Sequence, residues 1–358
     1  MYKLKEKYDT TFFLVCLKIG LGVLIYRVLL DLLSYLVVPV VSALVIFAPN
    51  NTVLYNSTSY LMTSVVSVLS FLVAAIVLWI LLRLGKKQNY QPTYWRWNIT
   101  PYAPFLIMAT VSANFAMSEI NALLISLLSP NVSMDIMMTG GVTVNVMEIF
   151  MLFVSTAVIP AIVEEIMFRG IILTNLIPYG RGTAIICSAF LFGLMHMNPS
   201  QFFYTTLMGI FLGYIYVRTR SIWICVLIHF VNNSLGILQQ IFYQYFDTAR
   251  YFKLESILML SVAALGIISM AVLFGVRAIK RVKSPTELGS FGRICEPSLS
   301  YEACPVTRSK KILFFFSPTV SLFTLMVFVS MITAAIGLFA IGLILGMFPG
   351  LFSEMFSM

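Results

Sequence analysis

Apolar runs long enough to cross a lipid bilayer follow one another along almost the whole chain. A transmembrane helix needs roughly 20 predominantly apolar residues, and such a run recurs about nine times. The chain of 358 residues is 60% hydrophobic and only 10% charged, so it has too few polar side chains to cover a water-facing surface. We therefore predict an all-α fold, a polytopic integral membrane bundle of about eight to ten transmembrane helices. The candidate spans lie near residues 11–48, 60–82, 103–129, 143–175, 183–198, 201–219, 221–245, 254–279 and 312–347.

The first of these stretches, residues 11–48, leaves two alternatives open. It is longer than one span requires, and it contains Lys18, Arg27, Asp31 and Pro39. It therefore crosses either once, with an interfacial segment, or twice. Its apolar run is too long and too interrupted for a cleaved signal peptide, so we expect an uncleaved first helix.

Basic residues are distributed unevenly along the connections between these spans. The segments 1–10, 83–101, 169–182, 218–220 and 277–311 hold most of the 23 Lys and Arg residues. Since cytoplasmic segments carry the excess of Lys and Arg, this pattern predicts a cytoplasmic N-terminus for a chain of nine spans. The net charge of +9 then points to anionic lipids at the cytoplasmic face, and it gives no reason to expect nucleic acid.

The polar segments and the five cysteines carry little functional signal. We expect residues 51–61 to form an uncharged outside loop with glycosylation-type sequences, and residues 88–102 to form an aromatic belt at the membrane interface. Residues 280–311 form the longest polar segment and are expected to be a partly ordered cytoplasmic loop, in which a disulfide is not expected. The cysteines at 16, 187 and 225 lie in apolar spans as small core residues.

One span carries three charges within six residues. In the stretch AVIPAIVEEIMFRGIIL, Glu165 and Arg169 are four residues apart and can pair on one helix face. Glu164 is rotated from Glu165 by about 100° and so points elsewhere. A buried ion-pair network at a helix contact would explain Glu165 and Arg169 but would leave Glu164 unpaired. A charge inside a bilayer is costly, so Glu164 is a candidate functional acid.

The only two histidines of the chain also fall within predicted spans. Phe192 and His196 are four residues apart, as are His229 and Asn233, so each pair shares one side of its helix. Each histidine alone can be an ordinary hydrogen-bonded core residue. Together with Glu164, however, they supply a base to activate water and donors to hold an oxyanion.

These three motifs together resemble the CAAX prenyl protease and bacteriocin-processing family. That family is also known as abortive-infection proteins or type II CAAX endopeptidases, and it includes the eukaryotic Ras-converting enzyme. The resemblance covers E-E-x-x-x-R, F-x-x-x-H and H-x-x-x-N, in that order, over residues 164–233. It implies a division into N-terminal transmembrane helices (1–140), a catalytic helical core (141–245) and C-terminal transmembrane helices with a basic cytoplasmic loop (246–358).

The resemblance implies an intramembrane endopeptidase with defined roles for these residues. Glu164 and His196 would activate the attacking water, and His229 and Asn233 would hold the oxyanion of the tetrahedral intermediate. Arg169 would pair with Glu165, and Phe192 would wall the pocket. We expect no cofactor. In the alternative, a metalloprotease, zinc would be bound by Glu164, His196 and His229, although the H-E-x-x-H signature is absent.

The expected substrate is a membrane-associated peptide or protein, either a prenylated CAAX tail, a pheromone or a bacteriocin-type precursor. The expected location is the bacterial cell membrane. Two other classes stay open. One is a non-catalytic immunity or regulatory protein of the same fold. The other is a haem-binding or transport protein, in which the two histidines would be axial ligands or the buried acids would carry protons.

Overall fold

The computed structural model describes residues 2–47, 52–84, 101–128 and 146–283, together with part of 309–332. These described residues form helices and the turns between them, without a strand, so the predicted all-α class is confirmed. Six helices of this part of the chain are long and apolar enough to cross a membrane. The molecule is therefore a polytopic helical membrane protein. The candidate spans are Thr10–Tyr35, Asn56–Arg83, Ala103–Leu123, Val146–Tyr179, Ile222–Tyr243 and Thr248–Val276.

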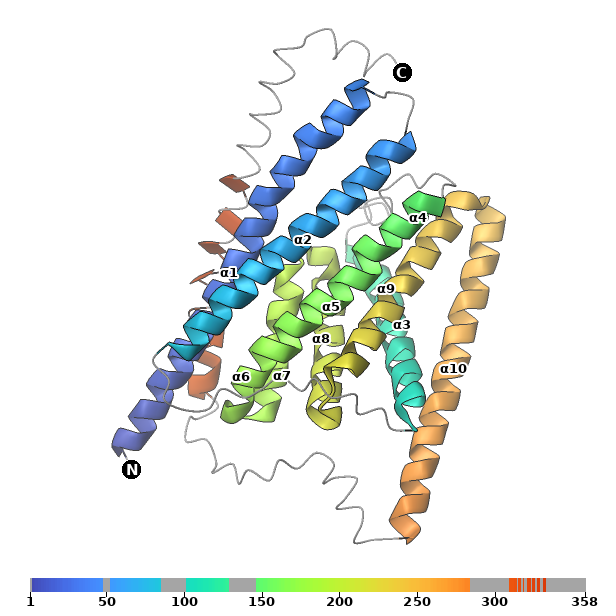
Figure 1. Cartoon of the computed structure of the whole chain (residues 1–358). Coiled ribbons are helices and arrows are strands. Elements are labelled where there is room, and N and C mark those ends of the chain that lie inside the picture. Colours follow the sequence, from blue (N-terminus) through green and yellow to red (C-terminus); the bar gives the residue numbers. More distant parts are fainter. Residues whose placement is uncertain are drawn as a thin grey trace.

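The first apolar stretch forms one uninterrupted helix, α1 (Tyr2–Phe47). It packs along α2 (Thr52–Arg83), and the two cross one side of the molecule together (Figure 1). Because α1 contains no turn, the stretch does not fold back as two antiparallel spans. Its charges Arg27 and Asp31 pair across one helical turn at 2.6 Å, which lowers the cost of placing them in an apolar span.

The predicted outside loop at residues 51–61 is wrong, since α2 already begins at Thr52. Its hydroxyl groups are compatible with a helix because they bond back to the preceding turn: Thr58 donates to the carbonyl of Leu54 at 2.7 Å. Asn56 donates to Glu148 at 3.2 Å and so joins the packed interior. The uncharged polar residues thus extend the helix instead of ending it.

The centre of the molecule is one long helical rod, residues 146–176, that widens from an α-helix to a π-helix at two places. Two π-helical segments, η2 and η3, flank the short α-helix that carries the paired glutamates. Such segments have wider turns than an α-helix and often occur at functional sites. A 3-10 turn and Gly180, with φ of +122°, then reverse the chain. The segments are α4 (Val146–Phe153), η2 (Val154–Val158), α5 (Ile159–Glu165), η3 (Ile166–Leu173), α6 (Thr174–Leu176) and η4 (Ile177–Tyr179).

The remaining described helices between residues 101 and 283 are α3, α7, α8, α9 and α10 (Figure 1). The apolar α7, of 15 residues, is shorter than the full span expected near residues 183–198. Helix α9 packs against the rod, α8 against α7, and α10 against α3. The bounds are α3 (Ala103–Leu128), α7 (Arg181–Met195), α8 (Pro199–Thr219), α9 (Ile222–Tyr245) and α10 (Thr248–Lys283).

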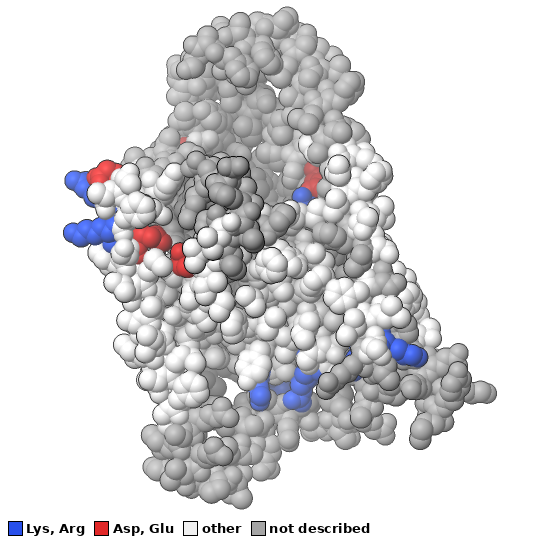
Figure 2. Space-filling view, turned by 180° about the vertical axis from the view of Figure 1, so that it is seen from behind, with Lys and Arg blue, Asp and Glu red and all other residues white. Residues whose placement is uncertain are grey.

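The helix ends that were predicted to face the cytoplasm share one end of the bundle. The start of α1, the ends of α2 and α10, and the turns before α7 and α9 all lie there (Figure 1). Figure 2 shows several Lys and Arg at this end, and others beside acidic residues near the opposite end. Arg169, which was counted within the basic segment 169–182, is instead buried inside the bundle. Which end faces the cytoplasm stays a prediction. The belt at 88–102, apart from its last two residues, the cysteines at 295 and 304, and most of the span at 312–347 lie outside the described residues.

Candidate active site

The ion pair that the spacing predicts is present at the end of α5. Nη1 of Arg169 donates to Oε1 of Glu165 at 2.7 Å, and the two side chains are 1% and 0% exposed. Helix η3 begins directly after Glu165, so the ion pair joins the last turn of α5 to the first turn of the π-helix. Each charge compensates the other in an interior where a single charge would be costly.

Glu165 has a second partner that the sequence analysis did not predict. The same Oε1 lies 2.9 Å from Nδ1 of His229, on α9. A carboxylate only accepts hydrogen bonds, so Nδ1 of His229 carries the hydrogen. Glu165 therefore orients His229 as well as pairing with Arg169, and it ties α9 to the rod. Its other oxygen, Oε2, is buried and has no hydrogen-bond partner among the described residues.

Glu164 points away from this pair, as its rotation predicts. It is 16% exposed, and its Oε2 lies 4.0 Å from Nε2 of His229, which is too far for a hydrogen bond. Tyr26 of α1 is near enough to interact electrostatically with it. The imidazole of His229 thus lies between two adjacent glutamates, one paired with an arginine and one available to a further group.

The ring of Phe192 connects the two histidines. It meets the ring of His196 edge-on at 4.9 Å and that of His229 at 5.9 Å, and the Arg169 guanidinium lies 4.6 Å from its centre. His196 ends α7, where its Nδ1 bonds to the carbonyl of Phe192 at 2.8 Å. This contact holds the imidazole and leaves Nε2 to face other groups. Phe192 is thus a neighbour of His196, and its role as the wall of a pocket stays a prediction.

Asn233 does not converge with His229 on one protein group. Its Nδ2 donates to the carbonyl of Thr156, in the π-helical segment η2, at 3.0 Å. Both side chains nevertheless face the rod, since His229 reaches Glu165 at the other end of α5. An amide nitrogen carries two hydrogens, so Asn233 retains one N–H for another acceptor.

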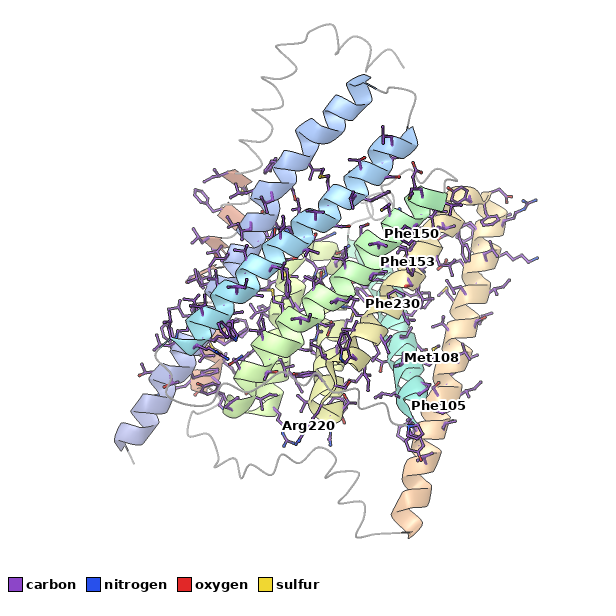
Figure 3. The ribbon with its side chains drawn as sticks, in the orientation of Figure 1. Phe105, Met108, Phe150, Phe153, Arg220 and Phe230 are labelled. Atoms are coloured by element: carbon purple, nitrogen blue, oxygen red, sulfur yellow. The ribbon has the colours of Figure 1, made fainter. Side chains whose placement is uncertain are left out.

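Two aromatic rings hold α9 against the rod near this contact. Phe230 follows His229 directly and meets Phe153 edge-on at 5.4 Å (Figure 3). Edge-to-face pairs of this kind prefer one mutual orientation. The pair therefore restrains the rotation of α9, and with it the directions in which His229 and Asn233 point.

Hydroxyl groups stabilise the wide turns of η3. Ser188 of α7 donates to the carbonyl of Phe168 at 3.0 Å, and Thr174 donates to that of Arg169 at 2.8 Å. The hydroxyl of Thr174 also lies 2.9 Å from that of Tyr216. Sequence reasoning missed these residues. The sequence shows only a threonine inside an apolar run, and it does not indicate which carbonyl accepts the hydrogen bond of its hydroxyl group.

The alternative zinc ligands are Glu164, His196 and His229. Glu164 is 4.0 Å from His229, and the ring of Phe192 packs against both imidazoles. In the described part of the chain, no group of three or more His, Cys, Asp and Glu side chains is placed to hold a metal ion. Whether this site binds zinc stays a prediction, and we derive no step through a metal.

Comparisons with known proteins agree with the motif resemblance. Residues 146–235 match the family described as "Type II CAAX prenyl endopeptidase Rce1-like". A Bacillus subtilis (strain 168) protein named "Putative membrane peptidase YdiL" is 33% identical over 94 residues, which are 25% of this chain and 37% of that protein. The chain thus matches little more than a third of the length of this relative. No solved structure matches the chain. The predicted resemblance is confirmed over the rod and the helices α7 to α9, and it points to a membrane protease.

Proposed function

We propose that this protein is an intramembrane endopeptidase that hydrolyses a membrane-associated peptide with water activated by Glu164 and His196. One observation carries the proposal. His229 lies between Glu165, which is paired with Arg169, and Glu164, which forms no ion pair with a Lys or Arg among the described residues. In this proposal Glu165 orients His229, and Glu164 takes part in the reaction.

Glu164 acts as the general base in this mechanism. It takes one proton from a water molecule, whose oxygen attacks the carbonyl carbon of the scissile bond. The proton then passes to the leaving amine as the C–N bond breaks. His196 binds the same water through Nε2, since Nδ1 is engaged by the carbonyl of Phe192. A positioned base contributes about 10²–10⁴-fold to the rate.

His229 and Asn233 stabilise the tetrahedral intermediate. In its doubly protonated form, His229 gives Nδ1–H to Glu165 and keeps Nε2–H for the oxyanion. Asn233 gives one N–H to Thr156 and keeps the other. Because these contacts hold both donors in place beforehand, little reorganisation is needed when charge develops. One such donor is worth about 10²–10³-fold in kcat.

The substrate class is a peptide at or in the membrane. The spans of the described helices and the family match support this class, and prenylated, pheromone and bacteriocin-type peptides all belong to it. The basic end of the bundle suits anionic lipid headgroups, and with that end inside, the N-terminus is cytoplasmic. We propose the bacterial cell membrane as the location.

The decisive variant is Glu164→Gln, which keeps the shape of the side chain and removes its negative charge. Membrane peptides from cells carrying the wild-type chain and this variant are compared by mass spectrometry, and the cleaved peptide found there is then tested on purified protein. Cleavage should fall by at least about 10²-fold. Glu119→Gln, on α3, is the matched control and should retain activity. Unchanged cleavage by Glu164→Gln would contradict the assignment, and identical peptide profiles would favour a non-catalytic regulator.

A further inference from the structure

The first transmembrane helix, α1, turns one buried stripe toward the interior of the molecule. Its buried hydrophobic residues recur every three or four positions, which is the spacing of one helix face. The stripe consists of Phe12, Val15, Cys16, Ile19, Val23 and Tyr26. In this set Tyr26 alone carries a hydroxyl group, and its side chain is 4% exposed. Helix α1 therefore brings one phenol into the interior of the bundle.

The stripe places Tyr26 at the level of Glu164. Phe12, at its lower end, lies 4.7 Å from Tyr179, in the turn just below the rod, when ring centres are compared. Figure 1 shows α1 running upward and the rod running downward. Tyr26 follows Phe12 by fourteen residues and Glu164 precedes Tyr179 by fifteen, so both lie roughly 20 Å above that contact. Tyr26 is rotated from Phe12 by only about 40°, so it keeps the same side of α1 toward the rod.

An electrostatic interaction between Tyr26 and Glu164 agrees with this placement. The carboxylate of Glu164 acts on the phenol of Tyr26, so the two groups are neighbours although they lie on different helices. They are not hydrogen-bonded to each other, and the Tyr26 hydroxyl has no hydrogen-bond partner among the described residues. Buried tyrosine hydroxyls usually bond to a partner. Tyr26 thus has a hydrogen bond to give to a further group beside Glu164.

Water suits this position because its hydrogen-bonding capacity matches the groups that would surround it. A buried water makes two to four hydrogen bonds. Its two hydrogens can go to the Glu164 carboxylate and to Nε2 of neutral His196, whose Nδ1–H is given to the carbonyl of Phe192. One lone pair can accept from the phenol of Tyr26. The other lone pair then remains for the carbonyl carbon of the scissile bond.

We propose that Tyr26 is a further residue of the candidate active site, and that its phenol donates a hydrogen bond to the water molecule that Glu164 activates. This bond holds the water with one lone pair toward the substrate. Helix α1 then completes a site whose other residues lie on the rod, α7 and α9. It lies outside residues 146–235, the part that matches the family. The role of the water rests on the proposed endopeptidase function, whereas the nearness of Tyr26 to Glu164 does not.

The kinetics of Tyr26→Phe test the role of the hydroxyl group, since phenylalanine keeps the ring and its packing. One hydrogen bond to the reacting water is lost, so kcat should fall by about tenfold while KM stays within about twofold. Tyr35→Phe is the matched control on the same helix. Residue 35 lies nine positions later and about 180° around α1, so this variant should keep its kcat. The melting temperature of Tyr26→Phe should change no more than that of the control.

Three results of this experiment would overturn the proposal. A kcat equal to that of the wild type would show that the hydroxyl has no part in the reaction. A rise in KM alone would assign the hydroxyl to substrate binding instead of water. A fall in kcat together with a clear fall in melting temperature, absent from the control, would make Tyr26 a structural support.

Cross-linking tests the position of Tyr26 without reference to activity. The full-length chain with Tyr26→Cys and Glu164→Cys is treated with a short bifunctional methanethiosulfonate, which reacts with thiolates, and linked peptides are identified by mass spectrometry. This pair should be linked, whereas Tyr35→Cys with Glu164→Cys should not, because residue 35 is on the opposite side of α1. Equal yields of the two links would overturn the proposal. If the wild-type protein cleaves no peptide, the endopeptidase function fails, while the cross-link still decides whether Tyr26 faces Glu164.

Discussion

Two ion pairs with the same i, i+4 spacing lie in the membrane-spanning helices of this protein. Arg27 and Asp31 pair on α1 at 2.6 Å with side chains 22% and 13% exposed. Glu165 and Arg169 pair on the rod at 2.7 Å and are almost completely buried. In both cases the two residues are four positions apart on one helix, which allows their side chains to pair. Around the second pair, α9 places a histidine and α7 an aromatic ring, and α5 itself carries a second glutamate.

The difference shows how charges become useful inside a membrane. On α1 the pair neutralises two charges so that the helix can span. On the rod, the same carboxylate oxygen that accepts from Arg169 also accepts from His229, so the pair becomes a support for a residue of the candidate site. The arginine balances the charge of Glu165, and Glu164 beside it is the base of the proposed mechanism.

The largest expected effect comes from removing one member of the buried pair. Arg169→Gln leaves Glu165 as an uncompensated buried charge and should lower stability by about 3–5 kcal/mol. Arg27→Gln, the matched change on α1, should cost clearly less because its partner is more exposed. Thermal unfolding of the purified variants in detergent checks this order. Equal losses would show that burial does not distinguish the two pairs.

A double-mutant cycle separates the charge of the pair from its role in orienting His229. Glu165→Gln combined with Arg169→Gln removes both charges, so much of the stability lost in Arg169→Gln should return. Peptide cleavage should not return with it, because the neutral amide no longer supports a protonated His229. Melting temperature and kcat are measured on the same preparations. Strictly additive losses of stability would mean that the two residues do not interact.

A smaller effect is expected from the hydroxyl groups that support η3. Ser188→Ala leaves the carbonyl of Phe168 without this donor in a buried position, and should cost about 1–3 kcal/mol. Ser256→Ala, on an exposed face of α10, is the control and should change little, since its hydroxyl bonds only to the preceding turn of its own helix. Thermal unfolding is again the measurement. If the Ser188→Ala variant were as stable as its control, the hydroxyl group of Ser188 would not stabilise η3.

The smallest expected effect is that of metal chelation. Water activated by Glu164 and His196 does not depend on a bound ion, so cleavage after exhaustive treatment with EDTA or phenanthroline should stay within about twofold of the untreated rate. The assay uses the purified protein in detergent, with and without added zinc. Activity that disappears with chelation and returns only with zinc would favour the metalloprotease alternative.

Much of this architecture could be predicted because the forces involved are local or compositional. Apolar runs of sufficient length indicate spanning helices, since an exposed backbone in lipid must satisfy its own hydrogen bonds. The spacing of Glu165 and Arg169 predicts their pair from helix geometry alone. The start of α2 was missed because serine, threonine and asparagine suggest a loop, while their hydroxyl groups can equally bond back to the helix.

The sequence by itself determined that the chain enters a membrane, that Glu165 and Arg169 pair, and that Glu164 points away from them, since these follow from composition and from rotation along one helix. Only the tertiary structure decided that Glu165 holds His229, that Phe192 lies between the two histidines, and that Asn233 reaches Thr156. Those contacts join residues far apart along the chain. They depend on how the helices pack and on the two π-helical segments, and neither is set by the spacing of residues within a single helix.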